Sequence, residues 1–140
     1  MKSVVFLADF FSTDLVGGAE LNDSVLLDGL TSHGIEVIKL RTSDLTDEDV
    51  IKNDLFIVSN FVNLSERHKN MVMLKKYIIY EHDHKYVKTR DPSHFKNYKA
   101  PEDQIINREF YKNAKAIICQ SKLHMRVVER NLHLDNIVSV

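Results

Sequence analysis

The chain is poor in cysteine, proline and glycine, and it has no tryptophan. Its 140 residues include one cysteine, two prolines and four glycines. A single cysteine excludes an internal disulfide, and the place of Cys119 in the apolar run AIIC predicts a buried, unreactive thiol. No apolar run approaches the ~20 residues of a membrane-spanning helix, and SVVFLA after Lys2 is short for the core of a signal peptide. We therefore expect a cytoplasmic chain without an integral membrane segment.

A strong charge of either sign is also missing. The formal net charge is −1, which argues against a protein whose whole surface binds nucleic acid. Hydrophobic residues make up 44% of the chain and charged residues 28%, an ordinary globular balance. This length and composition predict one domain over residues 1–140 with a core of its own.

Short apolar runs alternate with segments of helical period. Strands are predicted at 3–8, 35–40, 54–60, 75–83, 115–121 and 136–140, and helices at 18–34, 64–74, 102–114 and 122–132, with a short helix or turn opening at Ser43. Ser65 and Ser121 are the expected N-caps, and His33-Gly34 the expected stop of the first long helix. Near-continuous apolar strands joined by helices predict an α/β domain, doubly wound, with a mainly parallel sheet of about six strands.

Two of the helices carry a predicted packing face. The first helix has one apolar stripe. The helix at 102–114 has Pro101 before its first turn and four residues on a common face. The stripe consists of Leu21, Val25, Leu26 and Leu30, and the common face consists of Ile105, Ile106, Glu109 and Phe110.

Gly17 and Gly18 stand between the first strand and the first helix, at the strand edge where such sheets bind ligands. Glycine lets the main chain approach a ligand, and the helix that follows offers unpaired N–H groups to an anion. We expect a phosphate or a sugar hydroxyl here, with Glu20 complementing the helix dipole or accepting from a hydroxyl. A plain tight turn is the alternative. The pattern is neither a dinucleotide fingerprint nor a P-loop.

The order of these motifs resembles the amino-terminal half of a GT-B glycosyltransferase. The first strand is followed by GGAE opening a helix, then by LTSHGIEV, and later by KNAKAIICQSKLHMRVVERNLHLDNIVSV. In that order the motifs are similar to the retaining family 4, and the resemblance spans nearly the whole chain. It implies the Rossmann-like, acceptor-side half of an enzyme that transfers a sugar from a nucleotide-sugar donor to a hydroxyl acceptor, with retention.

The resemblance also implies what this chain lacks. The sequence stops at Val140, about where the link to the carboxyl-terminal domain begins in these enzymes. That domain holds most of the nucleotide-sugar site. We therefore expect the carboxyl-terminal donor-binding domain to be absent and the isolated chain to be inactive, with no cofactor and no bound metal.

The run YEHDHK, residues 80–85, places four ionisable side chains in a row at the end of the fourth strand. In similar enzymes a histidine at this point lies over the transferred sugar, so the resemblance assigns that role to His82. Glu81 and Asp83 would orient the acceptor or, in an inverting enzyme, act as general base. A metal site from His82 and His84 lacks a third ligand, and a solvated strand end is the structural alternative.

The segment 84–99 combines five cations with aromatic residues, namely Lys85, Lys88, Arg90, Lys96 and Lys99 with Tyr86, Phe95 and Tyr98. This pattern suits an anionic acceptor such as a phosphorylated lipid or glycan, and leaves single-stranded nucleic acid as a further partner for this segment alone. A solvated surface is the alternative. The resemblance places the region beside the acceptor cleft, which favours Lys88 and Arg90 as acceptor-binding residues.

A second function remains open at this point. The same α/β architecture serves non-catalytic binding or regulatory modules that work on their own. Receiver domains of this architecture cluster acids after the first strand, whereas only Asp9 stands here. A nucleotide-binding enzyme of Rossmann type is a third interpretation, weakened by the missing fingerprint.

Overall fold

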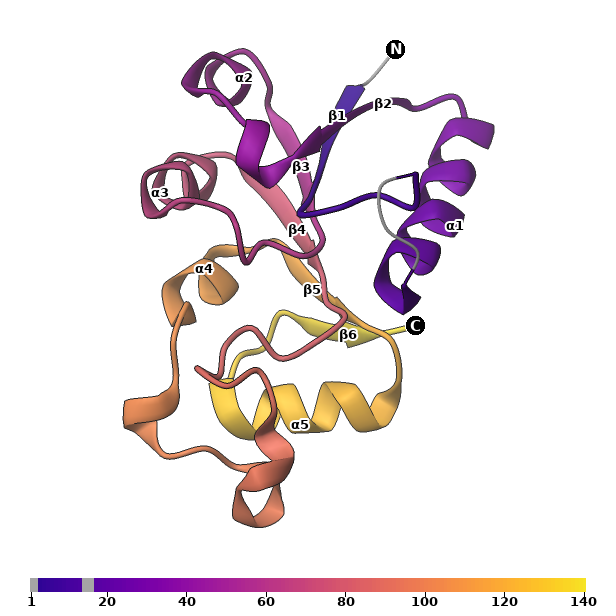
Figure 1. Cartoon of the computed structure of the whole chain (residues 1–140). Helices are drawn as coiled ribbons and strands as arrows, with labels where there is room; N and C mark the ends of the chain where they lie inside the picture. The colour runs from indigo at the N-terminus through magenta and orange to yellow at the C-terminus, as the bar shows by residue number, and fades with distance from the viewer. Residues whose placement is uncertain (1–2, 14–16) are drawn as a thin grey trace. The chain divides into compact units, whose positions relative to one another are not determined.

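The computed structural model describes residues 3–13 and 17–140, which alternate between strands and helices (Figure 1). The chain divides into two compact units, Met1–Tyr77 and Ile78–Val140. The first unit contains β1 (Ser3–Ala8), α1 (Gly18–Ser32), β2 (Glu36–Arg41), η1 (Thr42–Asp44), α2 (Asp47–Ile51), β3 (Leu55–Val58) and α3 (Glu66–Met73). β4 (Lys76–Tyr80) leads into the second unit, which contains η2 (Pro92–His94), η3 (Lys96–Tyr98), η4 (Glu102–Gln104), α4 (Arg108–Asn113), β5 (Ala116–Cys119), α5 (Lys122–Leu132) and β6 (Ile137–Ser139).

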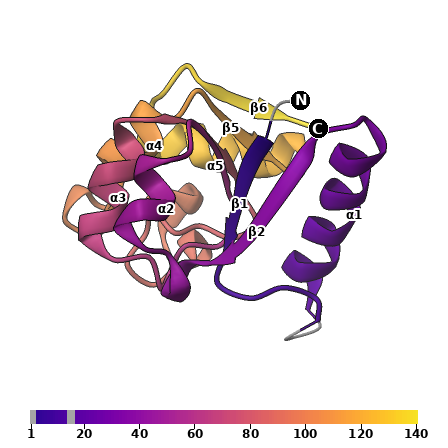
Figure 2. The ribbon, with the colours of Figure 1, turned by 90° about the horizontal axis from the view of Figure 1, so that it is seen from above.

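The strands are parallel, in the order β2-β1-β3 in the first unit and β4-β5-β6 in the second. The register pairs Val5 with Ile38 and Phe56 in the first unit, and Ile117 with Ile79 and Ile137 in the second. In the first unit, α1 lies on one face of the strands and α2 and α3 lie on the other (Figures 1 and 2). The α/β class and the parallel sheet of six strands are therefore confirmed.

The apolar stripe predicted for α1 is only half right. Leu26 and Leu27 pack against a cluster that Phe6, Ala8 and Phe11 form. However, Leu21 is 51% exposed and Val25 is 73% exposed. The inward face of the helix instead carries two buried acids, Glu20 and Asp23, which the periodicity of apolar residues does not register.

Most helix ends lie where the sequence places them. The hydroxyls of Ser65 and Ser121 each accept from the backbone N–H three residues on, as N-caps do. Gly34 follows α1 with a φ of +78°, a left-handed conformation that costs glycine little. A short helix or turn is expected to open at Ser43, and the 3₁₀ turn η1 (Thr42–Asp44) lies there; α2 follows after a capping box that Thr46 and Asp49 form.

The single helix predicted at 102–114 is wrong. It breaks into η4 and α4, separated by Asn107 in a left-handed conformation. Ile105 forms an antiparallel bridge with Val87, and the N–H of Ile106 donates to the carbonyl of Tyr86 over 2.8 Å. Two consecutive β-branched residues favour this extended pairing, which satisfies backbone groups that a helix would otherwise bond internally.

Cys119 is buried in β5, as expected, and burial raises the pKa of its thiol to about 12. The thiol is therefore protonated and a poor nucleophile at neutral pH. Within residues 3–13 and 17–140, no helix combines the length and apolar character that crossing a membrane requires.

Candidate functional site

The amino end of α1 is built around Gly17 and Gly18. Gly17 is the N-cap residue and offers no side-chain cap. A Cβ placed on Gly17 would lie 2.9 Å from Oε2 of Glu20, so the buried Glu20 side chain turns back over the glycine. A carboxylate in the first helical turn is favoured by the helix dipole. Gly17 thus makes room for Glu20, while a Cβ on Gly18 would meet open space.

The predicted ligand loop before this helix is only partly in view, since residues 14–16 lie outside the described residues. Asp9 directly follows the strand β1 and is buried. Its carboxylate accepts from the Thr42 hydroxyl and from the backbone N–H groups of Val62 and Asn63, at 2.8 and 3.0 Å. Asp9 therefore ties together the segments that follow β1, β2 and β3.

Asp23, the third buried acid of the first unit after Asp9 and Glu20, was not among the residues predicted from the sequence. The hydroxyl of Ser59, directly after β3, lies 2.8 and 2.7 Å from its two carboxylate oxygens. Asp23 follows Glu20 by three residues and so shares its helix face. Two acids three residues apart on a helix could have predicted this polar face, from which Asp23 contacts the residue that follows β3.

In the second unit, the segment 81–85 after β4 is organised by a lysine. Lys85 is 2% exposed, and its Nζ lies 2.5 Å from Oε1 of Glu81 and 2.8 Å from Oδ1 of Asp83. Glu81 itself is fully buried. One ammonium thus holds the carboxylates on both sides of His82, which is half-buried and meets the Tyr80 ring edge-on at 4.8 Å between centroids.

The electrostatics of this pair follow from burial. Burial raises the pKa of Glu81, and the Lys85 ammonium opposes that rise. Burial also lowers the pKa of Lys85. The carboxylates of Glu81 and Asp83 have the larger combined effect, so the pKa of Lys85 is raised. The Tyr111 hydroxyl interacts with Glu81, and burial beside this carboxylate raises the pKa of Tyr111. Glu81 is therefore placed to support its neighbours and not to contact a ligand.

Two histidines lie next to this ion pair. The rings of His84 and His124 are 4.8 Å apart, and Nδ1 of His84 lies 2.6 Å from the Tyr86 hydroxyl. Burial, with a contribution from His124, lowers the pKa of His84 to about 4, and burial also lowers the pKa of His124. Both rings are therefore neutral at pH 7. His124, in the first turn of α5, was not among the predicted site residues.

The predicted basic segment 84–99 does not form one surface. Lys85 is internal, which corrects the expectation that it adds to the surface charge. Lys88 is exposed, and Arg90 is exposed with a φ of +60° and an Nη1 atom 3.7 Å from Oδ2 of Asp83. Arg90 thus joins the network around His82, while Lys96 and Lys99 border a separate hollow.

The described residues contain no group of three or more His, Cys, Asp or Glu side chains arranged to hold a metal ion. Comparison with known proteins adds no identity: no protein-family model matches the chain, and no curated protein is significantly similar to it. The order of the motifs and the arrangement of the side chains are therefore the features from which a function can be inferred.

Proposed function

We propose that the chain is the amino-terminal, acceptor-side domain of a GT-B glycosyltransferase. The complete catalytic unit would transfer a sugar from a nucleotide-sugar donor to a hydroxyl acceptor, with retention. The parallel α/β architecture supports this proposal, as does the GGAE segment that opens α1. Donor binding would need the carboxyl-terminal domain of such an enzyme in addition to this chain.

The observation that carries the proposal is the fixation of His82. Lys85 binds the carboxylates of Glu81 and Asp83, so the backbone on either side of His82 is held in place. A catalytic or sugar-binding group gains from such preorganisation, because less ordering remains to be done when the substrate binds. A solvated strand end has no need of a buried ion pair behind it.

Each predicted residue has a distinct role in this proposal. His82 would hydrogen-bond a hydroxyl of the transferred sugar. Asp83, more exposed than Glu81, would orient the acceptor together with Arg90 and the exposed Lys88. Glu81 is a positioning residue, since it is fully buried and acts through Lys85.

The amino end of α1 would contact the donor. Because the Glu20 carboxylate lies over Gly17, this end is better suited to accept from sugar hydroxyls than to hold a phosphate alone. Gly18, which faces open space, leaves the main chain accessible to the ligand.

The test is His82→Ala in the natural polypeptide that contains this chain, assayed for sugar transfer over a panel of nucleotide sugars and acceptors. Removal of a positioned catalytic histidine lowers kcat by about 10²-fold or more. The matched control is His94→Ala, which removes a largely exposed histidine paired with Asp91. Circular dichroism checks folding of both variants. Equal turnover of the two variants would remove His82 from the site. Absence of transfer with every donor by the unmodified polypeptide would favour the binding-module interpretation.

A further inference from the structure

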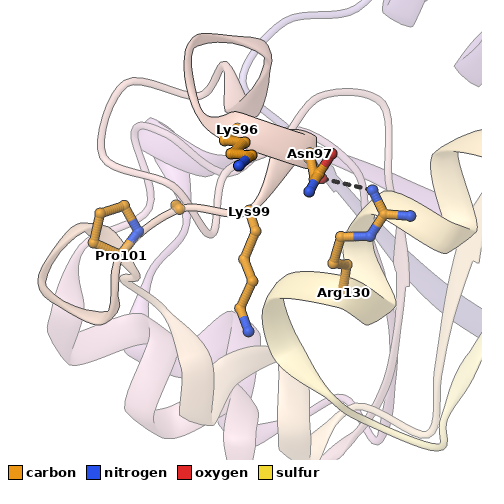
Figure 3. A pocket seen from close by; sticks show the side chains of 6 residues that line it. Lys96, Asn97, Lys99, Pro101 and Arg130 are labelled. Carbon is orange, nitrogen blue, oxygen red and sulfur yellow. Dashed lines mark hydrogen bonds between the residues drawn. The ribbon is translucent and has the colours of Figure 1, made fainter.

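A surface hollow of about 620 Å³ lies in the second unit, away from the segment 81–85. It is lined by Lys96, Asn97, Lys99, Ala100, Pro101 and Arg130. Figure 3 shows the lysine side chains and Arg130 around this hollow, the lysines coming from the loop 96–101 and Arg130 from α5. Three of the six lining residues are cations, and none is an acid.

The loop that carries the two lysines is strained. Asn97 and Tyr98 both adopt left-handed backbone conformations, with φ of +56° and +58°. Such a conformation is unfavourable for a non-glycine residue, less so for asparagine than for tyrosine. Two strained residues in succession persist only where the surrounding contacts determine the backbone.

Those contacts come from α5. Arg130 donates from Nη1 to the carbonyl of Asn97 over 2.6 Å. The buried Asn131 donates from Nδ2 to the carbonyl of Tyr98, and its Oδ1 accepts from the N–H of Ala100, both at 2.8 Å. Three hydrogen bonds therefore fasten the loop to the helix and keep Lys96 and Lys99 beside Arg130.

The charges of the hollow are not neutralised from within. In the part of the chain that the structure describes, Lys96, Lys99 and Arg130 form no ion pair with a carboxylate. Two acids adjoin the lining residues in sequence: Glu129 lines a neighbouring hollow with Arg126 and Arg130, and Glu102 pairs with Arg108 at 2.8 Å. Holding three like charges together costs free energy, and a bound anion offsets that cost.

We propose that this hollow binds a phosphate-bearing ligand, with Lys96, Lys99 and Arg130 as the cationic contacts. The guanidinium group of Arg130 is already oriented by its bond to Asn97, and arginine pairs well with phosphate oxygens. The ligand is a compact anion such as a diphosphate or a phosphorylated headgroup, because the cations surround one concavity and do not form a long track. The proposal is independent of sugar transfer, since none of the residues that line the hollow is among those assigned to the sugar-transfer site.

The experiment titrates the chain with inorganic pyrophosphate and follows backbone amide resonances by NMR. The resonances of 96–100 and of Arg130 should shift together in a saturable way, and raising NaCl from low to high concentration should weaken binding, because salt screens exposed charges. Vesicles of phosphatidylcholine with and without a phosphoinositide, in a sedimentation assay, distinguish a lipid headgroup from a soluble phosphate.

The decisive variant is Lys96→Gln/Lys99→Gln, which should weaken pyrophosphate binding at least tenfold. Its matched control is Lys112→Gln/Lys115→Gln, which removes two exposed lysines with the same spacing outside the hollow and should bind like the wild type. Thermal melting shows that both variants are folded. Equal affinity of the two variants would overturn the proposal. Binding of a single-stranded oligonucleotide, or of vesicles irrespective of their phosphoinositide, without binding of pyrophosphate would also overturn it, because a diffuse basic surface would then be responsible.

Discussion

Replacement of Lys85 by methionine tests the buried ion pair on which the candidate site depends. The substitution keeps an unbranched, apolar side chain out to the Cε position and removes the ammonium that Glu81 contacts at 2.5 Å. Glu81 is 0% exposed, so water cannot replace the lost partner. Removing one member of a buried pair typically costs about 3–5 kcal/mol, a large share of the 5–15 kcal/mol that stabilises an ordinary domain.

The pH dependence of this cost has a definite sign. Lys85 is the main group that opposes the effect of burial on Glu81, so without it burial raises the pKa of Glu81 further above the value in the unfolded chain. A group with a raised pKa favours the folded state when it is protonated, and this contribution is lost as the pH rises through the folded-state pKa. The deficit of Lys85→Met relative to wild type should therefore be smallest near pH 4 and largest above pH 7.

Urea unfolding followed by tyrosine fluorescence provides the measurement, because the chain has no tryptophan and four of its five tyrosines, Tyr80, Tyr86, Tyr98 and Tyr111, lie in 78–140. Lys52→Met, which removes an exposed partner of Asp49, should cost less than about 1 kcal/mol. Glu81→Gln/Lys85→Met should recover most of the loss, because no buried charge remains unpaired. A cost for Lys85→Met as small as that for Lys52→Met would refute the buried pair.

Two further outcomes concern His84 and the end of α1. Burial lowers the pKa of His84 from 6.5 to about 4, so the folded state resists protonation. The full shift corresponds to about 3 kcal/mol, which solvent screening of the partly exposed ring reduces to about 2 kcal/mol of stability that should be lost as the pH falls from 6.5 to 4. NMR titration of the ring checks the pKa, and a value near 6.5 would contradict the burial. Gly34→Ala should lower the free energy of unfolding by about 1 kcal/mol, because Gly34 has a φ of +78°. Gly18→Ala, in open space, is the control and should change it by less than about 0.5 kcal/mol; equal urea midpoints would refute the strain argument.

The sequence alone determined the strands, the parallel α/β class and most of the helix caps. These features depend on neighbours in the chain: an apolar run favours a strand, and Ser65 and Ser121 cap the amide three residues on. The same local patterns placed Gly17-Gly18 at the start of α1 and His82 two residues after the end of β4. The chemical role of both positions remains a proposal.

The tertiary structure decided which polar residues are internal. In the sequence Lys85 belongs to a basic segment. In the structure it is buried, because its ammonium donates to the carboxylates of Glu81 and Asp83. Asp23 meets Ser59 from 36 positions away, and the bridge between Val87 and Ile105 breaks a helix that periodicity favours. Local periodicity does not predict contacts of this kind, because the two partners lie far apart in the sequence. Each partner's polar side chain or extended backbone is satisfied only when the chain has folded.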